Sequence, residues 1–163
     1  MWLFVLDDKD ESIIRVIGRR SGMSSRKLSG MLKIPISTVH RRIKNFEDEG
    51  VITGYMALID YQKTSWPIGA LLLVDLMEVI PGKGHIPKKE IIGILSNFSE
   101  VEEIVDVQAA EFDLMLKARF RTLRKLSDFV ERLRDIEGIE ETKSAVITDE
   151  RVLPPPLIVR IND

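Results

Sequence analysis

The chain has 163 residues, of which 44% are apolar and 31% charged, and its formal net charge is −2. This length suits one medium domain or two small ones, and the apolar fraction excludes a disordered chain. The absence of cysteine excludes a disulfide framework, a thiolate zinc site and a cysteine nucleophile. With only two histidines, His40 and His85, we expect no metal site and no cofactor.

The hydropathy pattern argues against a membrane protein. No apolar run reaches the roughly 18 residues that a membrane span needs. The short apolar N-terminus has no basic flank, so it does not resemble a signal peptide, and we expect a cytoplasmic protein. Asn and Gln total five, a scarcity typical of proteins from hot habitats.

The small net charge conceals a basic block. Between Ser12 and Phe46 the chain holds nine Lys and Arg residues and no acidic residue, and acidic clusters lie on both sides. Such a block favours a polyanion site, because neutralising phosphates drives non-specific nucleic-acid binding. The alternative is a solvated charged face, which is the usual role of a charge run.

Three short helices are expected in this part of the chain. Their limits are Asp10 or Ser12 to Ser21, Ser24 or Ser25 to Leu32, and about Ile36 to Glu49 with Gly50 as the C-terminal stop. A turn at Ile34-Pro35 separates the second helix from the third. Two helices joined by a short turn, the second of them basic, constitute a helix-turn-helix.

The third helix has two faces at about 100° per residue. Val39, Ile43 and Phe46 fall on the side expected to be buried, and Arg42 lies near its edge. Ser37 and Arg41 lie opposite, so small hydroxyls come first and long basic side chains follow. That order suits entry into the major groove. The candidate DNA-binding residues are Ser24, Ser25, Arg26, Lys27, Ser37, Thr38, His40, Arg41, Arg42 and Lys44. The alternative is a three-helix packing unit with a solvated face.

Three segments together resemble the Lrp/AsnC (leucine-responsive regulatory protein) family of bacterial and archaeal transcription regulators. They are Leu6-Asp7-Asp8-Lys9-Asp10, Ser37-Thr38-Val39-His40-Arg41-Arg42-Ile43 and Glu49-Gly50-Val51-Ile52-Thr53-Gly54-Tyr55. The resemblance implies a DNA-binding domain that is followed by an extended strand or hinge. Two positions depart from the family: Lys33 stands where it usually has glycine, and Pro35-Ile36 where it usually has serine and proline.

The remaining hundred residues predict the order βαββαβ, a ferredoxin-like split βαβ. Strands are expected over 68–79, 101–107, 114–120 and 139–147, and helices over 88–98 and 122–136. The second strand contains one extra residue, which predicts a β-bulge near Glu102-Glu103. The fold class is therefore α+β, a winged-helix-like helix-turn-helix followed by a ferredoxin-like domain. We divide the chain into a DNA-binding domain over 1–50, a hinge over 51–66, a regulatory and assembly domain over 67–150 and a proline-rich tail over 151–163.

The resemblance also implies assembly and a ligand. The family forms homodimers through this sheet, and its dimers assemble into tetramers or octamers. Many members bind an amino acid beside a loop of the pattern Gly-x-aromatic-Asp, which corresponds here to Ala110-Glu111-Phe112-Asp113. Ala109, Ala110, Glu111 and Asp113 are therefore the candidate effector-binding residues, since a free amino group needs a carboxylate. The alternative is a plain turn in which Asp113 bonds to its own backbone.

Three functions fit these observations. The first is a sequence-specific DNA-binding transcription regulator that responds to an amino acid or another small effector. The second is an architectural protein that binds DNA without sequence preference and without an effector. The third is an enzyme similar to the sirohaem decarboxylases, which share the two-domain fold. The basic ridge from Ser37 to Lys44 argues against the enzyme.

Overall fold

The computed structural model describes residues 6–19, 22–79, 82, 84, 87–109 and 111–151. The chain divides into two compact units, residues 1–58 with 151–163 and residues 59–150. The division at Leu58 and Ile59 falls inside the segment that the sequence predicts as a hinge. No helix among the described residues is long and apolar enough to cross a membrane.

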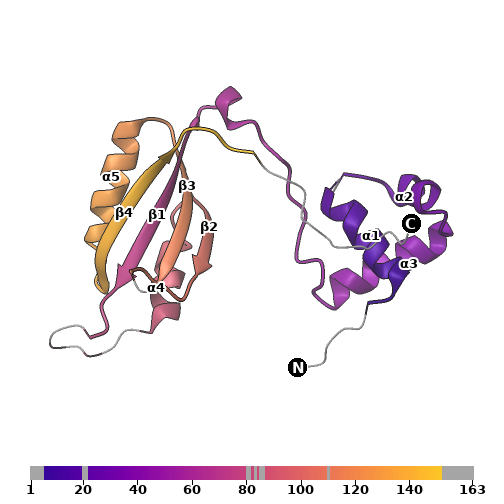
Figure 1. Ribbon diagram of the computed structural model, residues 1–163, viewed down its shortest axis with the longest axis horizontal. Helices are drawn as coiled ribbons and strands as arrows, with labels where there is room; N and C mark the ends of the chain where they lie inside the picture. Colours follow the sequence, from indigo (N-terminus) through magenta and orange to yellow (C-terminus); the bar gives the residue numbers. More distant parts are fainter. Residues whose placement is uncertain are drawn as a thin grey trace. The chain divides into compact units, whose positions relative to one another are not determined.

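The first unit is built from three helices, α1 (Asp8–Arg19), α2 (Ser25–Leu32) and α3 (Ile36–Asp48) (Figure 1). They share one small core, whose buried members are Ile13, Ile17, Leu28, Ile34, Val39 and Phe46. Each helix contributes the apolar face that its 3.6-residue period predicts. Gly50, with φ +69°, ends α3 as expected.

Helix α1 begins at Asp8, before the predicted start at Asp10 or Ser12. The Asp10 backbone N–H donates to Asp7 Oδ1 at 2.8 Å, and the Asp7 N–H donates to Asp10 Oδ2 at 3.1 Å. This reciprocal arrangement is a capping box in which aspartate replaces the usual Glu or Gln. The prediction was wrong because Asp10 serves as the third helical residue, where its carboxylate reaches back.

The turn between α2 and α3 is held by a side chain and by one unusual backbone conformation. Ser29 Oγ donates to the Ile34 carbonyl oxygen at 2.6 Å. Lys33 has φ +53° and ψ +35°, in the left-handed region that disfavours residues with a Cβ. The family usually has glycine at this position, and the backbone geometry gives the physical reason.

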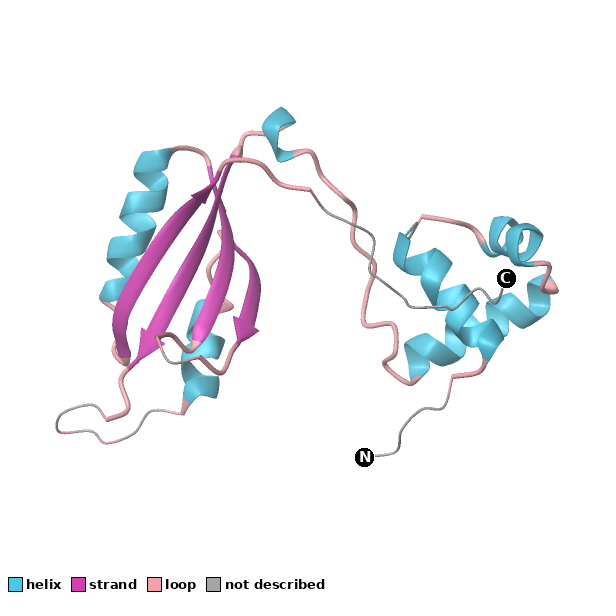
Figure 2. Ribbon diagram, in the orientation of Figure 1, coloured by secondary structure: helices cyan, strands magenta, loops and turns pink. Residues whose placement is uncertain are grey.

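Residues 51–60 carry neither helix nor strand, and a short 3₁₀ turn, η1 (Tyr61–Lys63), follows them (Figure 2). The segment exposes large apolar side chains, with Met56 81% and Leu58 76% accessible. Of the two expectations for this segment, strand or hinge, the strand is absent and the hinge stays a prediction.

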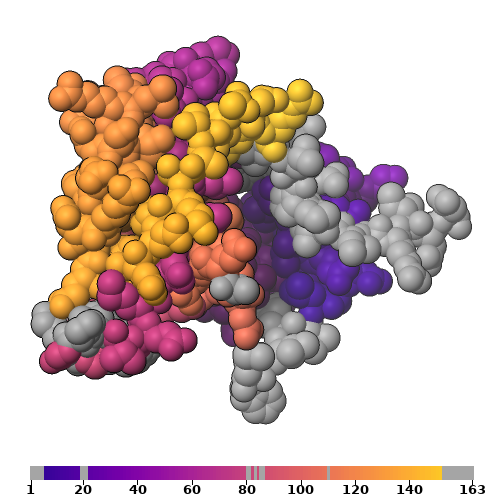
Figure 3. Space-filling view, turned by 60° about the vertical axis from the view of Figure 1, so that its left-hand side comes forward, coloured from indigo at the N-terminus to yellow at the C-terminus, as the bar shows by residue number. Residues whose placement is uncertain are grey.

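The second unit is a four-stranded antiparallel sheet with two helices. Its elements are β1 (Ile68–Leu76), α4 (Lys88–Leu95), β2 (Val101–Asp106), β3 (Leu114–Phe120), α5 (Leu123–Arg134) and β4 (Ile139–Ile147). The strand order is β2-β3-β1-β4, which is the split βαβ arrangement that the sequence predicts. Both helices cover one face of the sheet (Figure 1), and α5 and β4 lie side by side at the surface (Figure 3).

The core of this unit lies between the sheet and the two helices. Alternate residues of β1 (Ala70, Leu72 and Val74) point into it, and Phe129 of α5 packs edge-on against Phe98 at 5.3 Å. The register of β2 against β3 shifts between Val101 and Glu103, so the predicted β-bulge is confirmed. Four predicted elements were too long at their ends: β1, α4, β2 and α5.

Replacing Lys33 with glycine should stabilise the first unit by about 0.5–1 kcal/mol. Glycine removes the cost of the left-handed conformation, and part of that gain is offset by its greater freedom in the unfolded chain. Hydrogen exchange of the core amides of α2 and α3 measures the change. Lys33→Ala is the matched control, because it removes the charge but keeps the strain. Equal stabilities of the two variants would contradict this explanation.

Candidate nucleic-acid interface and effector loop

The candidate DNA-binding residues of α3 form one exposed ridge. Ser37, His40, Arg41 and Lys44 are exposed, and Thr38 is half-buried at its side. Val39 and Phe46, on the opposite face, are almost completely inaccessible. The helix therefore presents the hydroxyl-then-basic order that the sequence predicts.

The N-terminus of α3 has no side-chain cap. Pro35 lacks the oxygen that a capping side chain would supply, and its carbonyl accepts hydrogen bonds from the N–H groups of Thr38 (2.9 Å) and Val39 (3.0 Å). The first turn holds no acidic residue. The positive end of the helix dipole is therefore not neutralised by a local carboxylate, which favours contact with a phosphate.

The first turn of α2 carries the other candidates. Ser24 is the N-cap of α2, and its Oγ accepts from the Lys27 N–H at 3.5 Å. Ser25 is half-buried, whereas Arg26 and Lys27 are exposed. Ser24 thus has a structural role as well as its proposed role at the DNA.

Arg42 does not join the ridge. Its guanidinium donates to Asp7 Oδ1 at 2.8 Å and also pairs with Asp10 Oδ1. Asp10 is only 8% exposed. The hydrogen bond from Arg42 holds the pKa of the Asp7 carboxyl below its ordinary value, and the two carboxylates raise the pKa of Arg42. We therefore correct the candidate set: Arg42 joins α3 to the start of α1.

Four basic candidates keep their charge available. No ion pair within the described part of the chain engages Arg26, Lys27, Arg41 or Lys44. Phosphates gain most from cations that have no protein partner to give up. These four side chains are the ones best prepared to contact DNA.

Two exposed residues near the ridge were missed by the sequence analysis. Lys33 lies in the turn before α3, and Ile36, in the first turn of α3, is 48% exposed. The 3.6-residue period places Ile36 beside the buried arc, so periodicity gave no signal. For Lys33 the departure from glycine was the available signal.

In the second unit, Asp113 is fully engaged within the chain. Its Oδ1 lies 2.9 Å from Lys88 Nζ, and its Oδ2 accepts from the Leu76 N–H at 3.1 Å. Its backbone N–H donates to the Val74 carbonyl at 2.9 Å. The predicted alternative, a bond from Asp113 to its own backbone, is therefore wrong. The carboxylate fastens the start of β3 to β1 and α4.

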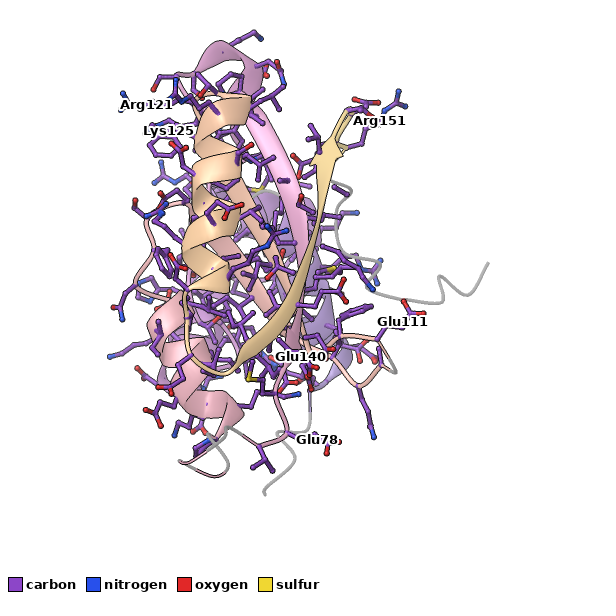
Figure 4. The ribbon with its side chains drawn as sticks, turned by 90° about the vertical axis from the view of Figure 1, so that its left-hand side faces the viewer. Glu78, Glu111, Arg121, Lys125, Glu140 and Arg151 are labelled. Atoms are coloured by element: carbon purple, nitrogen blue, oxygen red, sulfur yellow. The ribbon has the colours of Figure 1, made fainter. Side chains whose placement is uncertain are left out.

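The other effector candidates differ in their setting. Ala109 and Glu111 are exposed, and Ala110 lies outside the described residues. Glu111 lies toward the end of the sheet that also carries Glu78 and Glu140, whereas Arg121 and Lys125 lie toward the other end (Figure 4). Glu111 is thus the candidate carboxylate that remains accessible.

A second charge cluster, also missed from the sequence, lies on the sheet face that the helices leave open. Arg119 is 7% exposed, donates from Nε to Glu102 Oε2 at 3.1 Å, pairs with Glu150, and stacks 4.1 Å from the Tyr61 ring centroid. The β-bulge aims Glu102 at this arginine, so the extra residue of β2 has a structural purpose.

Comparisons with known proteins agree with this geometry. Residues 6–53 match the family described as winged helix-turn-helix DNA-binding, and residues 87–157 match the Lrp/AsnC ligand binding domain. An uncharacterized HTH-type transcriptional regulator of Pyrococcus furiosus is 28% identical over 141 residues, which cover 86% of this chain and 90% of the relative.

Solved structures show the same fold. A transcriptional regulator of Neisseria meningitidis in complex with L-Met has a TM-score of 0.80 and 22% identity, covering 94% of this chain and 97% of that one. The feast or famine regulatory protein of M. tuberculosis complexed with L-methionine has a TM-score of 0.79 and 24% identity, covering 93% of this chain and all (100%) of that one.

The fold and the basic helix-turn-helix define a class: DNA-binding transcription regulators that carry a separate ligand-binding domain. Within that class, the chain belongs to the Lrp/AsnC family, as the sequence segments indicate. This membership makes it a regulator and not the decarboxylase-like enzyme that shares the fold.

Replacing Arg42 with alanine should lower the free energy of unfolding of the first unit by about 1–3 kcal/mol, because it leaves the nearly buried Asp10 carboxylate without its cationic partner. The lowered pKa of Asp7 contributes stability above the ordinary pKa of aspartate, and that stability is lost as the pH falls through the lowered value. The acid sensitivity should therefore be smaller in the variant. Denaturant titrations across this pH range measure both effects.

Arg41→Ala is the control for this substitution, since it removes an exposed arginine one residue away. Its stability should stay close to that of the wild type. If both variants lost the same stability, the ion pair of Arg42 would have no special role.

Proposed function

We propose that the chain recognises specific DNA sequences through α3, with Arg41 reaching base edges and Lys44, Arg26 and Lys27 reaching phosphates. The observation that carries the proposal is the exposed ridge whose cations have no partner in the described part of the chain. Ser37 and Thr38 at the start of the ridge are short enough to let the helix backbone approach the groove floor, and His40 lies beside them. Ser24 and Ser25 support the approach of α2 to the backbone of the duplex.

We propose further that the protein acts as a homodimer that assembles into tetramers or octamers. The open face of the sheet supports the dimer, because it presents half-buried apolar residues such as Leu71, Leu73 and Met115 beside the Arg119 cluster. Paired subunits would place two recognition helices on a two-fold symmetric DNA site. We propose that the protein is located in the cytoplasm, which contains the DNA.

The effector is proposed to be an amino acid bound beside Ala109, Ala110 and Glu111. The ligand-binding family of residues 87–157 supports a small ligand, and the two relatives in complex with L-methionine support an amino acid. Because Lys88 already neutralises Asp113, the exposed Glu111 is the carboxylate left for the amino group. In this proposal Asp113 positions the loop and does not contact the ligand.

The architectural alternative makes a different prediction about sequence preference. A protein that only compacts DNA binds specific and random duplexes with similar affinity at a fixed salt concentration. A regulator shows a specificity ratio of about 10³ or more. Selecting bound fragments from a genomic library, then titrating the best fragment and a shuffled one, separates the two.

Arg41→Ala should weaken binding to the selected fragment by about 1–3 kcal/mol and relax the preference at one base position, because a bidentate base contact is lost. Lys44→Ala and Arg26→Ala should weaken binding to all DNA sequences alike. Each should also reduce the slope of log affinity against log salt concentration by about one. Fluorescence anisotropy at several salt concentrations measures both parameters. Unchanged affinity of Arg41→Ala for the selected fragment would show that α3 is not the reading helix.

Glu111→Gln should abolish any rise in melting temperature that an amino acid produces, because the amide cannot neutralise an ammonium group. Thermal melting with a panel that includes L-methionine provides the measurement. Glu78→Gln is the control, a carboxylate toward the same end of the sheet. A panel that shifts neither the melting temperature nor the DNA affinity of the wild type would refute effector binding by those amino acids.

A further inference from the structure

Lys88 reaches two carboxylates, one at the end of β2 and one just before β3. Its Nζ lies 2.9 Å from Asp113 Oδ1 and 3.0 Å from Asp106 Oδ1. Asp106 is the last residue of β2, Asp113 directly precedes β3, and Lys88 is the first residue of α4. Three elements therefore converge on one ammonium group, and the Lys88 side chain that carries it is 33% exposed.

One of the two acceptors, Asp113, is held in place independently of the lysine. Asp113 is fixed to β1 by its bonds with the Leu76 N–H and the Val74 carbonyl, and its own carbonyl accepts from the Val107 N–H at 2.9 Å. The carboxylate thus accepts one backbone hydrogen bond from β1, and the Asp113 backbone is held by two more. The other carboxylate oxygen is left facing the ammonium, so this acceptor is preorganised.

The lysine, in contrast, lies where its own helix disfavours it. A positive charge in the first turn of a helix is opposed by the helix dipole, and acidic residues are the usual choice there. Lys88 tolerates this position because two carboxylates face it. Their hydrogen bonds raise the pKa of Lys88, that from Asp113 most of all, and Lys88 in turn lowers the pKa of Asp113.

We propose that Asp106 and Asp113 form a binding site for a primary ammonium group, and that Lys88 is its built-in occupant. The start of β3 is then held in place without a bound amine. The proposal rests on the proposed function in one respect: it explains why an effector's amino group would have to use Glu111 and not Asp113.

A tethered ammonium is difficult to displace. Groups joined by a short flexible linker have effective concentrations of about the millimolar order or above. Lys88 is additionally attached to a folded helix, so its ammonium cannot move far from the two carboxylates. Free amines at micromolar concentrations should therefore not compete, and the site becomes available only when Lys88 is removed.

The test is chemical rescue of Lys88→Ala. The variant should melt several degrees below the wild type in sodium chloride and recover at least half of that loss in ethylammonium chloride of equal ionic strength. Tetramethylammonium chloride should give no recovery, because it has no N–H to donate. Lys89→Ala removes the neighbouring exposed lysine. The melting temperature of this control should be the same in all three salts.

Three results would overturn the proposal. One is a Lys88→Ala variant that loses stability and is not rescued, which would mean that the ion pair is structural only. Another is equal rescue by tetramethylammonium. The third is loss of the rescue in Lys88→Ala/Glu111→Gln, which would place the amine at Glu111. Retained rescue in that double variant supports the site even if no natural amino acid binds the wild type.

A measurement on the unaltered protein covers the case in which Lys88→Ala does not fold. Nuclear magnetic resonance of the lysine ammonium groups should show a Lys88 signal protected from water exchange at neutral pH, and Asp113→Asn should remove the protection of that signal. A Lys88 signal that exchanges as fast as those of exposed lysines would contradict a bound ammonium.

Discussion

The ion pair of Arg42 with Asp7 and Asp10 and the buried face of Val39 and Phe46 together set the rotation of the recognition helix, and the DNA-binding surface depends on that rotation. Successive residues of a helix differ by about 100° in direction. With Arg42 directed at the start of α1, the neighbouring Arg41 has to point away from the core. The same carboxylate of Asp10 also caps α1, so one acidic residue fixes both where α1 starts and which arginine faces solvent.

The second unit obeys the same constraint, that a charge placed near the core has to find a partner. Arg119 of β3 is the neighbour of Gly69 on β1. A Cβ added at Gly69 would come within 2.6 Å of the Arg119 guanidinium. The absence of a side chain at Gly69 makes room for this arginine, and Glu102, Glu150 and the Tyr61 ring then surround it. Tyr61 belongs to the segment that enters this unit and Glu150 to the one that leaves it, so the arginine holds both chain ends of the sheet.

The features that could be predicted from the sequence are those that repeat along the chain. The apolar periods of the helices and strands gave the βαββαβ order and the small helical core, and an extra residue in β2 gave the bulge at Glu102. The helix ends were less accurate, because a cap depends on a pair of side chains. Nothing in the spacing shows that Asp10 would turn back to Asp7, or that Arg42 would leave the ridge for these two residues.

The sequence did not predict the partner of Asp113 in the effector loop, and the physical cause is related. Asp113 was a reasonable carboxylate for an amino group when considered alone, since its loop follows the family pattern. Its partner Lys88 is separated from it by the rest of α4 and by β2, and only the closing of the sheet brings the two together. Periodicity reports on which face a residue lies, and it carries no information on which distant charge will meet it there.

Two lysines of this chain occupy positions that their local structure disfavours. Lys33 adopts a left-handed backbone conformation that glycine would adopt at lower cost, and Lys88 lies at the positive end of a helix dipole. Local physics disfavours a lysine at both positions. A residue kept against its local preference indicates a role elsewhere. At Lys88 the compensating contact is the ion pair of its ammonium with Asp106 and Asp113, and at Lys33 we infer that it is a positive charge presented to DNA before the recognition helix.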